Sequence, residues 1–506
     1  MNLPEGVSSG DFAAAVAELK KSVGDAWVFT EQSHTDTYRD YYSPLSGADN
    51  EGVPSVAVAP ANTEEVQKVV RVANRFGIPF WVNSTGKNYG YGGPGGIVKG
   101  TMNIDLKRMN RVLEASEKHA YVLVEPGVSW LDMYAYLKEN DIKLWLDPPA
   151  PAWGSVLANA IERGVGYTNY CERTHYICGL EVVLPDGELV RTGMGALPTA
   201  GELWQGFPTG QGPYADGIFT QTNVGIVTKL GLHLQPEPPV YLAADVNGPD
   251  YESMIPLLDV MRPMRHAGII HNNASLYPFY ENGGIVTIST EDPAKIHHWS
   301  NFISFYGLPG QVDAQWEYVQ DVYARDMPGV SFASRRYEAP HTDLDKRVHP
   351  LDIQRAGIPK MLPYEHEAYM SIIFPFEGQA AMDVITAFND VAKKYGRRYG
   401  GTLMHAENPH ALITTSGMSI RPKDTAFNGV TQKILEEWVD VSAERGWGAY
   451  RSHITVMDKA QRAYSFNNHA LTRLHERIKD ALDPNGVMAP GKNGIWPRQY
   501  RDGANG

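Results

Sequence analysis

The chain has 506 residues, of which 43% are hydrophobic and 20% are charged, so it is long enough to form two or three hydrophobic cores. Its formal net charge of −13 argues against binding to nucleic acid or to an anionic membrane surface. Two cysteines, Cys171 and Cys178, cannot build a disulfide framework or a cysteine-rich metal site. We expect both to be small buried residues, although a bridge between them remains an alternative. No metal site is predicted.

The sequence shows no basic amino-terminal segment followed by an apolar core, as a signal peptide would have. No apolar run approaches the roughly 18 residues that a membrane-spanning helix needs. The expected location is the cytoplasm, with no membrane partner. The 27 tyrosines and 11 tryptophans suit a protein that handles a flat, partly polar ligand, but they also fill ordinary cores.

The first elements alternate between helix and strand. Apolar residues at helical spacing predict an amphipathic helix over 11–23, and residues 54–60 have the pattern of a short buried strand. A helix is expected to begin at Thr63, followed by an apolar strand at 78–82. This order predicts a small α/β unit.

A glycine-rich stretch follows that strand: Ser84-Thr-Gly-Lys-Asn-Tyr-Gly-Tyr-Gly-Gly93. Glycines let several backbone N–H groups approach one anion closely, and Lys87 adds positive charge, so a pyrophosphate is the expected guest. The spacing matches neither the P-loop nor the G-x-G-x-x-G dinucleotide loop. Taken alone, such a stretch is more often a structural turn than an anion site.

Further elements continue the mixed pattern. A helix is expected over 129–139, and a second helix begins at Gly154-Ser155, where its amino terminus offers another anion site. Asp186-Gly187 predicts a hairpin turn, and residues 219–231 predict a further pair of strands. A boundary is expected near residues 236–239.

Several phrases, taken together, resemble one family. They are Ser84–Gly93, Glu125–Val128, Glu162–Thr168, Arg191–Pro198, Asp216–Asn223, Gly225–Lys229, Gly448–Arg451 and Asp483–Trp496. They are similar, in the same order, to phrases of the vanillyl-alcohol oxidase and p-cresol methylhydroxylase family of FAD-dependent phenol oxidoreductases, and by length to its eugenol-oxidase type. The match is strong up to residue 235 and again from residue 446.

The resemblance implies an α+β fold with three parts: an FAD-binding domain of two subdomains of the p-cresol methylhydroxylase type (1–237), a cap domain with a large antiparallel sheet flanked by helices (238–446), and a carboxy-terminal segment that returns to the FAD-binding domain (447–506). It also implies a homodimer. Residues expected to contact FAD are Ser84, Thr85, Gly86, Lys87, Asn88, Gly90, Gly154, Ser155, Asn159, Gly164, Gly166, Gly225, Ile226 and Lys492, the last beside the pyrimidine end of the flavin.

The resemblance further implies a substrate clamp formed by Tyr91, Tyr450 and Arg451, with Tyr167 in the same pocket. A benzylic C–H bond yields hydride readily only when a para-hydroxyl is ionised. Two hydroxyls and a permanently charged guanidinium favour the phenolate. The implied reaction is oxidation of para-substituted phenols through a p-quinone methide, followed by water addition or by formation of an alkene or aldehyde.

One departure from the family concerns its aspartate beside the flavin. Ala150 stands at that position, so the base expected to assist water addition is missing. Asp147 is a substitute to consider, although a carboxylate that only opens the loop is an equally good interpretation.

A second departure concerns the covalent flavin tether of relatives. His366 lies within one position of the histidyl site, and Tyr364 and Tyr369 are tyrosyl candidates. A non-covalent flavin is the third alternative. Nearby, His405, Glu407 and His410 could suggest a metal site, but the proline between the histidines argues against helical ligand spacing, and solvated or core histidines are favoured.

The electron acceptor is left between two alternatives. O2 would give hydrogen peroxide, whereas a cytochrome c would serve in the methylhydroxylase branch, which also lacks the aspartate. We favour O2, because no export signal is visible. A flavin oxidase of a non-phenolic alcohol and a catalytically silent flavoprotein are further alternatives, but neither explains the presence of all three clamp residues.

We predict that Ala150→Asp changes the ratio of hydroxylated to alkenyl products from 4-alkylphenols, because it returns a carboxylate to the position of the missing base. Product analysis by chromatography measures this ratio. An unchanged ratio across several substrates would contradict the alignment at residue 150.

Overall fold

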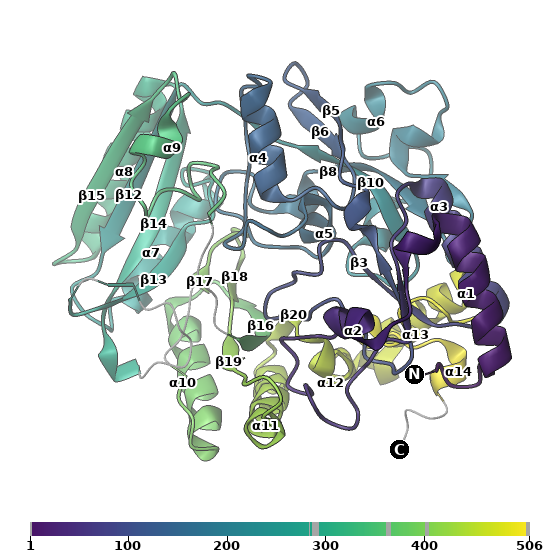
Figure 1. Cartoon of the computed structure of the whole chain (residues 1–506). Coiled ribbons are helices and arrows are strands. Elements are labelled where there is room, and N and C mark those ends of the chain that lie inside the picture. Colours follow the sequence, from purple (N-terminus) through teal and green to yellow (C-terminus); the bar gives the residue numbers. More distant parts are fainter. Residues whose placement is uncertain (1–2, 283, 286–292, 361–365, 400–403, 502–506) are drawn as a thin grey trace.

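The computed structural model describes residues 3–501 apart from 283, 286–292, 361–365 and 400–403. Its described strands form sheets of four, five and nine strands and a two-stranded ribbon that pairs β7 (Leu144–Trp145) with β11 (Gln235–Pro236). Figure 1 shows the largest sheet on one side of the molecule and the two smaller sheets, with both ends of the chain, on the other. The α+β fold and the large antiparallel cap sheet predicted above are confirmed.

The four-stranded sheet contains the predicted α/β unit. Strands β2 (Val56–Val58), β4 (Met102–Asp105) and β3 (Phe80–Asn83) are parallel, and β1 (Val28–Phe29) is antiparallel at the edge. Helix α3 (Thr63–Phe76) connects β2 to β3, and α1 (Ser9–Val23) packs against α3. Asn62 is the N-cap residue of α3, and its side chain accepts a hydrogen bond from Glu65 N at 2.9 Å.

The five-stranded sheet is antiparallel. Its order is β5 (Val112–Ser116), β6 (Tyr121–Val124), β10 (Ile226–His233), β8 (Ile177–Val183) and β9 (Leu189–Arg191). Helices α4 (Trp130–Glu139) and α5 (Val156–Ile161) lie close to it, and the hairpin at Asp186-Gly187 is confirmed. The strand pair expected over 219–231 is wrong. Only β10 forms. Asp216–Phe219 is a short 3₁₀ helix, and the amide of Asn223 donates to the carbonyls of Ala489 and Ile495 and not to a neighbouring strand.

The nine-stranded sheet forms the cap. Its strands are β15 (Ser331–Glu338), β12 (Val240–Asn247), β14 (Ile296–Gly307), β13 (Ser275–Tyr280), β17 (Met404–His405), β18 (Ala411–Thr414), β16 (Glu367–Pro375) and β19 (Gly417–Ser419), with β20 (Gly448–Ser452) also on β16. Helices α7 (Met254–His266), α8 (Pro309–Asp326), α10 (Gly378–Lys394) and α11 (Thr425–Ala443) bury their apolar faces in the same core as the sheet.

The carboxy-terminal segment returns to the first sheet. After α12 (Met457–Arg462) and α13 (Phe466–Leu482), residues Val487 and Ala489 bond the backbone of Phe80 in β3, each at 2.7 Å. The fully buried Lys479 fixes this segment: it pairs with Asp483 at 2.7 Å and donates to the carbonyl of Met488. The boundaries after residues 237 and 446 stay predictions.

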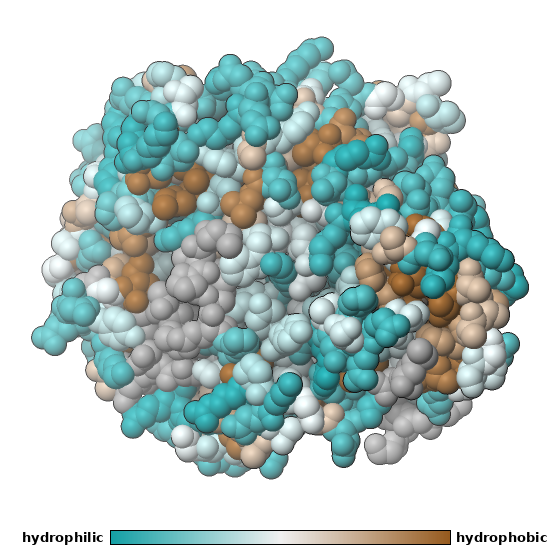
Figure 2. All heavy atoms as spheres, viewed as in Figure 1, coloured by the Kyte–Doolittle hydropathy of each residue, from teal (hydrophilic) through white to brown (hydrophobic). Residues whose placement is uncertain are grey.

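The surface and the cysteines add two observations. Cys171 and Cys178 are both free and buried, as expected from the sequence. On the face seen in Figure 2, hydrophilic residues separate the hydrophobic ones into small patches. Among the described residues, no helix is both long enough and apolar enough to cross a bilayer.

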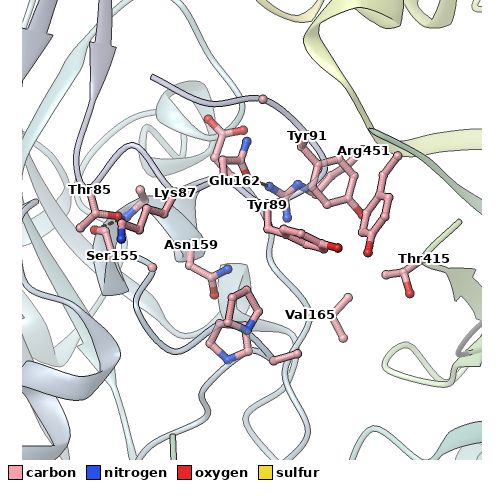
Figure 3. Close-up of a pocket in the computed structure, with 18 of the residues that line it drawn as sticks. Thr85, Lys87, Tyr89, Tyr91, Ser155, Asn159, Glu162, Val165, Thr415 and Arg451 are labelled. Atoms are coloured by element: carbon pink, nitrogen blue, oxygen red, sulfur yellow. Dashed lines mark hydrogen bonds between the residues drawn. The ribbon is translucent and has the colours of Figure 1, made fainter. Parts of the chain in front are cut away.

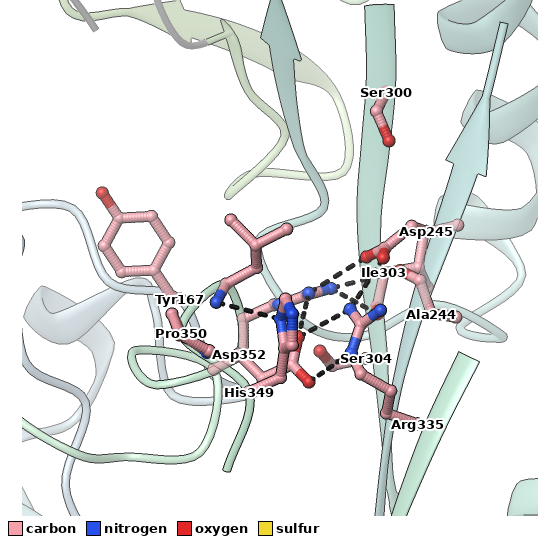
Figure 4. A network of polar contacts seen from close by, with 12 residues as sticks. Tyr167, Ala244, Asp245, Ser300, Ile303, Ser304, Arg335, His349, Pro350 and Asp352 are labelled. Carbon is pink, nitrogen blue, oxygen red and sulfur yellow. Dashed lines mark hydrogen bonds and ion pairs between the residues drawn. The ribbon is translucent and has the colours of Figure 1, made fainter. Parts of the chain in front are cut away.

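A buried ion-pair network attaches residues 349–358 to the cap sheet (Figure 4). Asp352, which is fully buried, accepts from Arg335 at 2.7 and 2.8 Å and from Arg355 at 2.7 Å. Asp245 of β12 binds the same two arginines. Burial raises the pKa of Asp352, but hydrogen bonding to Arg335 and the charges of both arginines outweigh burial and lower it overall.

We predict that Asp352→Asn lowers the free energy of unfolding by about 3–5 kcal/mol, because it leaves the buried Arg355 and the partly exposed Arg335 short of a counter-charge. Urea unfolding followed by circular dichroism measures the change. The folded pKa is lowered, so this stabilisation is complete above the unfolded pKa of Asp and is lost as the pH falls through the folded pKa.

The matched control is Asp343→Asn, in an exposed pair with Arg347 at 3.1 Å, which should cost less than about 1 kcal/mol. Equal losses in the two variants, or a difference that persists at acid pH, would contradict this account of the network.

Candidate active site

A cavity of about 400 Å³ lies between the amino-terminal sheets and the cap. The glycine-rich stretch (residues 84–93) and the loop 149–155 form one part of its wall, and cap residues form the other. Of the residues predicted from the sequence, those that line it are Ser84, Thr85, Gly86, Lys87, Asn88, Tyr91, Gly154, Ser155, Asn159, Tyr167, Tyr450, Arg451 and Lys492. Figure 3 shows Thr85, Lys87 and Ser155 at one end and Tyr91 with Arg451 at the other.

The glycine-rich stretch needs its glycines for two reasons. Gly86 and Gly90 have φ values of +67° and +74°, a left-handed conformation that costs other residues energy. A Cβ on Gly90 would also lie 2.7 Å from the ring of Tyr369. Gly90 therefore permits close packing of the stretch against β16, while its neighbours Asn88 and Tyr91 face the cavity.

The second loop differs in detail from the expected anion site. Ser155 caps α5, because its hydroxyl accepts from Ala158 N at 3.1 Å, and it donates to the carbonyl of Pro126 at 2.6 Å. The hydroxyl hydrogen is thus committed inside the protein. Asn159, one turn later, lines the cavity and has a buried Oδ1 with no hydrogen-bond partner among the described residues. That oxygen can accept a hydrogen bond from a guest.

Five predicted cofactor residues do not line this cavity: Gly90, Gly164, Gly166, Gly225 and Ile226. Close packing explains why residues 164 and 166 are glycines. A Cβ on Gly164 would lie 2.1 Å from Asn159 Nδ2, and one on Gly166 would lie 1.5 Å from Asp147 Oδ2. These glycines make room for the side chains that position the cavity wall.

Three side chains from distant parts of the sequence meet at the other end of the cavity. The Arg451 guanidinium lies 4.0 Å from the centroid of the Tyr91 ring, and it donates to Asn88 Oδ1 at 2.5 Å. Tyr91 OH is 2.7 Å from Ser371 Oγ. The buried hydroxyl of Tyr450 has no hydrogen-bond partner among the described residues. The fold therefore brings the predicted clamp together.

Burial dominates the protonation of the two tyrosines. It raises the pKa of Tyr91, against a smaller opposing effect from Arg451. Burial also raises the pKa of Tyr450, helped by the nearby carboxyl of Glu407. Both hydroxyls therefore keep their hydrogens at neutral pH, and both can donate to an anionic oxygen.

Lys492 is paired in the cavity wall. Its Nζ donates to Glu162 Oε1 at 2.5 Å, and both residues line the cavity. Burial raises the pKa of Glu162, but the charges of Lys492 and Arg451 outweigh burial and lower it. Glu162 is therefore an anion that offsets part of the positive charge of Lys492. This charge of Glu162 was not predicted from the sequence.

Ala150 lines the cavity, as expected for the position without the family aspartate. Asp147 does not replace that carboxylate. It is buried, accepts from the backbone N–H groups of Tyr167 and Thr168 at 2.7 and 2.8 Å, and pairs with Arg173 at 3.2 Å. Its function is to hold the loop that carries Tyr167.

The candidate tether residues lie in different places. His366 is exposed and does not line the cavity, whereas Tyr369 does line it and donates to Glu367 at 2.9 Å. Tyr364 lies outside the described residues. The tether itself stays a prediction.

Apart from Tyr369, the cap residues of the cavity wall were not predicted as site residues from the sequence. His405, Tyr277 and Phe302 line the cavity, and the rings of the last two stack with centroids 4.4 Å apart. His405 is buried, which agrees with the expected core histidine, whereas His410 is exposed. The sequence signal for these cap residues was weak, because they lie in the cap part of the chain, where the family resemblance is thin.

The residues of the cavity fit FAD: a glycine-rich stretch, the unsatisfied oxygen of Asn159, and a lysine in the wall. Comparison with known proteins agrees. Residues 54–193 match an FAD binding domain, and residues 348–493 match the C-terminal domain of FAD linked oxidases.

The chain is also 31% identical to the flavoprotein subunit of 4-cresol dehydrogenase (hydroxylating) of Pseudomonas putida, over 97% of both chains. The 4-ethylphenol oxidase of Gulosibacter chungangensis, solved as an isoeugenol complex, superposes with a TM-score of 0.88 and 32% identity, over 99% of this chain and 100% of that one. A p-cresol methylhydroxylase with bound substrate gives 0.87 and 28%, over 98% and 99%.

Fold, cavity and matches define an FAD-linked oxidoreductase. More specifically, the chain belongs to the vanillyl-alcohol oxidase and p-cresol methylhydroxylase family of FAD-dependent phenol oxidoreductases, as the resemblance predicted.

We predict that Gly154→Ala leaves the fold intact but weakens FAD binding about tenfold or more, because overpacking a filled site costs about 1–3 kcal/mol. In the protein alone, the added Cβ meets nothing nearer than Pro151 O at 3.5 Å. The FAD content of the purified protein and its thermal unfolding measure the two effects. Gly429→Ala, in α11 with no atom within 4 Å of the added Cβ, is the control. Equal FAD content in both variants would show that Gly154 does not face the cofactor.

Proposed function

We propose that this enzyme oxidises para-substituted phenols, such as 4-alkylphenols and 4-hydroxybenzylic alcohols, at the benzylic carbon. One observation carries the proposal: Tyr91, Tyr450 and Arg451 line the same cavity as the residues that fit FAD. The similarity to a 4-cresol dehydrogenase and a 4-ethylphenol oxidase supports the same substrate class.

The clamp would favour the phenolate. A free phenol has a pKa of about 10, so it needs stabilising contacts to ionise at neutral pH. Tyr91 and Tyr450, both protonated, would donate to the phenolic oxygen, and Arg451 would add a permanent positive charge. The Tyr450 hydroxyl, buried without a partner among the described residues, is available for this contact.

Bound FAD supplies an acceptor for a hydride. The backbone of residues 84–88, Asn159 and the loop at Gly154 would hold it, and Lys492 would lie near the pyrimidine part of the ring. The phenolate electrons would expel hydride from the benzylic carbon and leave a p-quinone methide. Water addition would then give an alcohol, proton loss would give an alkene, and an alcohol substrate would give an aldehyde.

The cap would hold the aromatic ring. Tyr277 and Phe302 stack on each other in the cavity wall, and Tyr167 is fixed through its backbone by Asp147. These faces suit a flat ring whose para-substituent extends away from the clamp. Substituents on that ring would be selected by the same cap residues.

Anaerobic titration of the flavoprotein tests the proposal. Addition of 4-cresol, 4-ethylphenol or vanillyl alcohol should bleach the visible flavin absorbance. Bleaching by glycolate or a sugar but by none of the phenols would favour an oxidase of non-phenolic alcohols. Binding of phenols without bleaching would sink the proposal and favour a silent flavoprotein.

We propose O2 as the electron acceptor and a cytochrome c as the alternative. The named relatives include both an oxidase and a dehydrogenase flavoprotein subunit. Turnover of 4-ethylphenol in air, with hydrogen peroxide released, would support O2. Turnover only under argon with an added cytochrome c would support the alternative.

We predict that Tyr91→Phe slows anaerobic flavin reduction by 4-ethylphenol by about 10- to 100-fold, because a hydrogen bond to a charged group contributes about 1.5–3 kcal/mol. Stopped-flow absorbance measures the rate. Tyr170→Phe, a tyrosine that stacks on Tyr176 and does not line the cavity, should leave the rate unchanged. Equal rates in both variants would remove Tyr91 from the clamp.

A further inference from the structure

A carboxylate lies among the cations at the clamp end of the cavity. Glu162 directly follows α5 and lines the cavity, and its Oε1 accepts a hydrogen bond from Lys492 Nζ at 2.5 Å. Figure 3 shows Glu162 beside Arg451, on the side of the cavity where Tyr91 lies. The charge of Arg163, the next residue in the chain, also acts on this carboxylate. Glu162 is thus an anion surrounded by positive charge.

The helix does not account for a negative charge at this position. Glu162 is the C-cap residue of α5, where the last backbone carbonyls already concentrate negative charge, so a carboxylate there is disfavoured by the helix. What stabilises the charge is the set of cations around it. The side chains of Glu162 and Lys492 are 17% and 21% exposed, so water only partly screens their pair.

Arg451 lies near Glu162 but is not paired with it. Its guanidinium donates to Asn88 Oδ1 at 2.5 Å and lies over the ring of Tyr91, and it forms no ion pair in the described part of the chain. The guanidinium can therefore face a phenolate while it feels the negative charge of Glu162 at longer range. Lys492, in contrast, is held by Glu162 directly.

The other carboxylate of the described cavity wall has different partners. Glu367 accepts hydrogen bonds from the hydroxyls of Tyr369 at 2.9 Å and Tyr89 at 3.4 Å. A further cation of the wall, Lys87, lies at the opposite end of the cavity (Figure 3). Of the two carboxylates, Glu162 is therefore the one that is hydrogen-bonded to a cation.

The proposed reaction moves one negative charge through this part of the cavity. The C–H bond of the benzylic carbon breaks, its electron pair leaves with the hydrogen as hydride, and the phenolate becomes a neutral quinone methide. The hydride carries the negative charge from the clamp oxygen to bound FAD. Hydride transfer needs the two reacting centres in contact, so both ends of the transfer lie beside the same group of charges.

We propose that Glu162 lowers the positive potential of Arg451 and Lys492, and so sets both the ionisation of the bound phenol and the reduction potential of bound FAD. This inference rests on the proposed function. A phenolate that is stabilised too strongly in the ground state expels hydride less readily. A reduced cofactor that is stabilised too strongly passes its electrons on less readily. The carboxylate thus acts on both halves of the catalytic cycle.

Two substitutions separate the charge of Glu162 from its contact with Lys492. Glu162→Gln keeps an oxygen that can accept from Lys492 but removes the negative charge. Glu162→Asp keeps the charge but draws the carboxylate back from Lys492 by one methylene. If the charge is responsible, Glu162→Gln shifts both of the quantities described next, and Glu162→Asp stays close to wild type.

The first quantity is the ionisation of a bound phenol that cannot be oxidised. 4-Nitrophenol has no benzylic hydrogen, and its phenolate absorbs visible light. When the FAD-loaded enzyme with bound 4-nitrophenol is titrated with pH, the pKa of the ligand should be lower by about one unit in Glu162→Gln, the size expected for loss of one charge about 10 Å away.

The second quantity is the midpoint potential of bound FAD, measured by anaerobic equilibration with a reference dye. It should rise by about 30 mV in Glu162→Gln, which is a tenfold shift of a two-electron equilibrium. Glu437→Gln is the matched control, because Glu437 is paired with Lys394 at 2.8 Å but does not line the cavity. This control should leave both quantities at their wild-type values.

The outcomes separate two failures. If wild type is not bleached by 4-cresol, the proposed function fails. If wild type is bleached but Glu162→Gln changes neither quantity, only the assignment of Glu162 fails. A shift in Glu162→Asp with none in Glu162→Gln would show that Glu162 only positions Lys492. Loss of FAD from Glu162→Gln would show that the cofactor site needs the carboxylate to fold. Either of these last two results overturns the inference.

Discussion

The contact between the guanidinium of Arg451 and the ring of Tyr91 joins the parts of the molecule that form the active site. Arg451 belongs to β20, which is paired to the cap strand β16, whereas Tyr91 belongs to the glycine-rich stretch after β3. The same guanidinium binds Asn88, so one positive charge fixes the stretch and faces the clamp end of the cavity. A cation placed over an aromatic face is stabilised while its charge remains available to an anion.

The part of the cavity wall formed by residues 349–358 is held in place by electrostatic contacts. Residues 349–358 include Pro350 and Leu351 of the cavity wall, and they are attached to the cap sheet through Asp352 and two arginines. Arg355 also donates to backbone carbonyls of β12 and β14. This arrangement fixes a segment without regular structure of its own at a defined distance from the sheet. The shape of the cavity therefore depends on charges that lie outside it.

Local patterns and the family resemblance predicted much of the fold. The helices over 9–23, 63–76 and 130–139 and the hairpin at Asp186-Gly187 follow from apolar spacing, capping and turn residues. The strand pair at 219–231 was wrong: the amide of Asn223 donates to carbonyls more than 260 positions away and not to a neighbouring strand, and no local pattern contains such a contact. The clamp was predicted only through the resemblance, since its members are some 360 positions apart.

Some parts of the site could not be predicted from the sequence, and the reason is the same for each: their roles depend on contacts between distant residues. Glu162 was taken as part of a motif, but its charge matters only because the fold brings Lys492 to it. His405 resembles an ordinary core histidine in sequence, and its exposure to the cavity results from the antiparallel pairing of β17 with β13 and β18. Asp147 was weighed as a base, whereas its partners are backbone groups that a sequence does not reveal.

The return of residues 487–489 to the backbone of Phe80 has a consequence for biosynthesis. Strand β3, which leads directly into the glycine-rich stretch, completes its hydrogen bonds only with a segment made some 400 residues later. Tyr450, Arg451 and Lys492 join the cavity wall equally late. A ribosome must therefore translate past residue 492 before the pocket exists, so a shorter nascent chain cannot hold the flavin in this cavity.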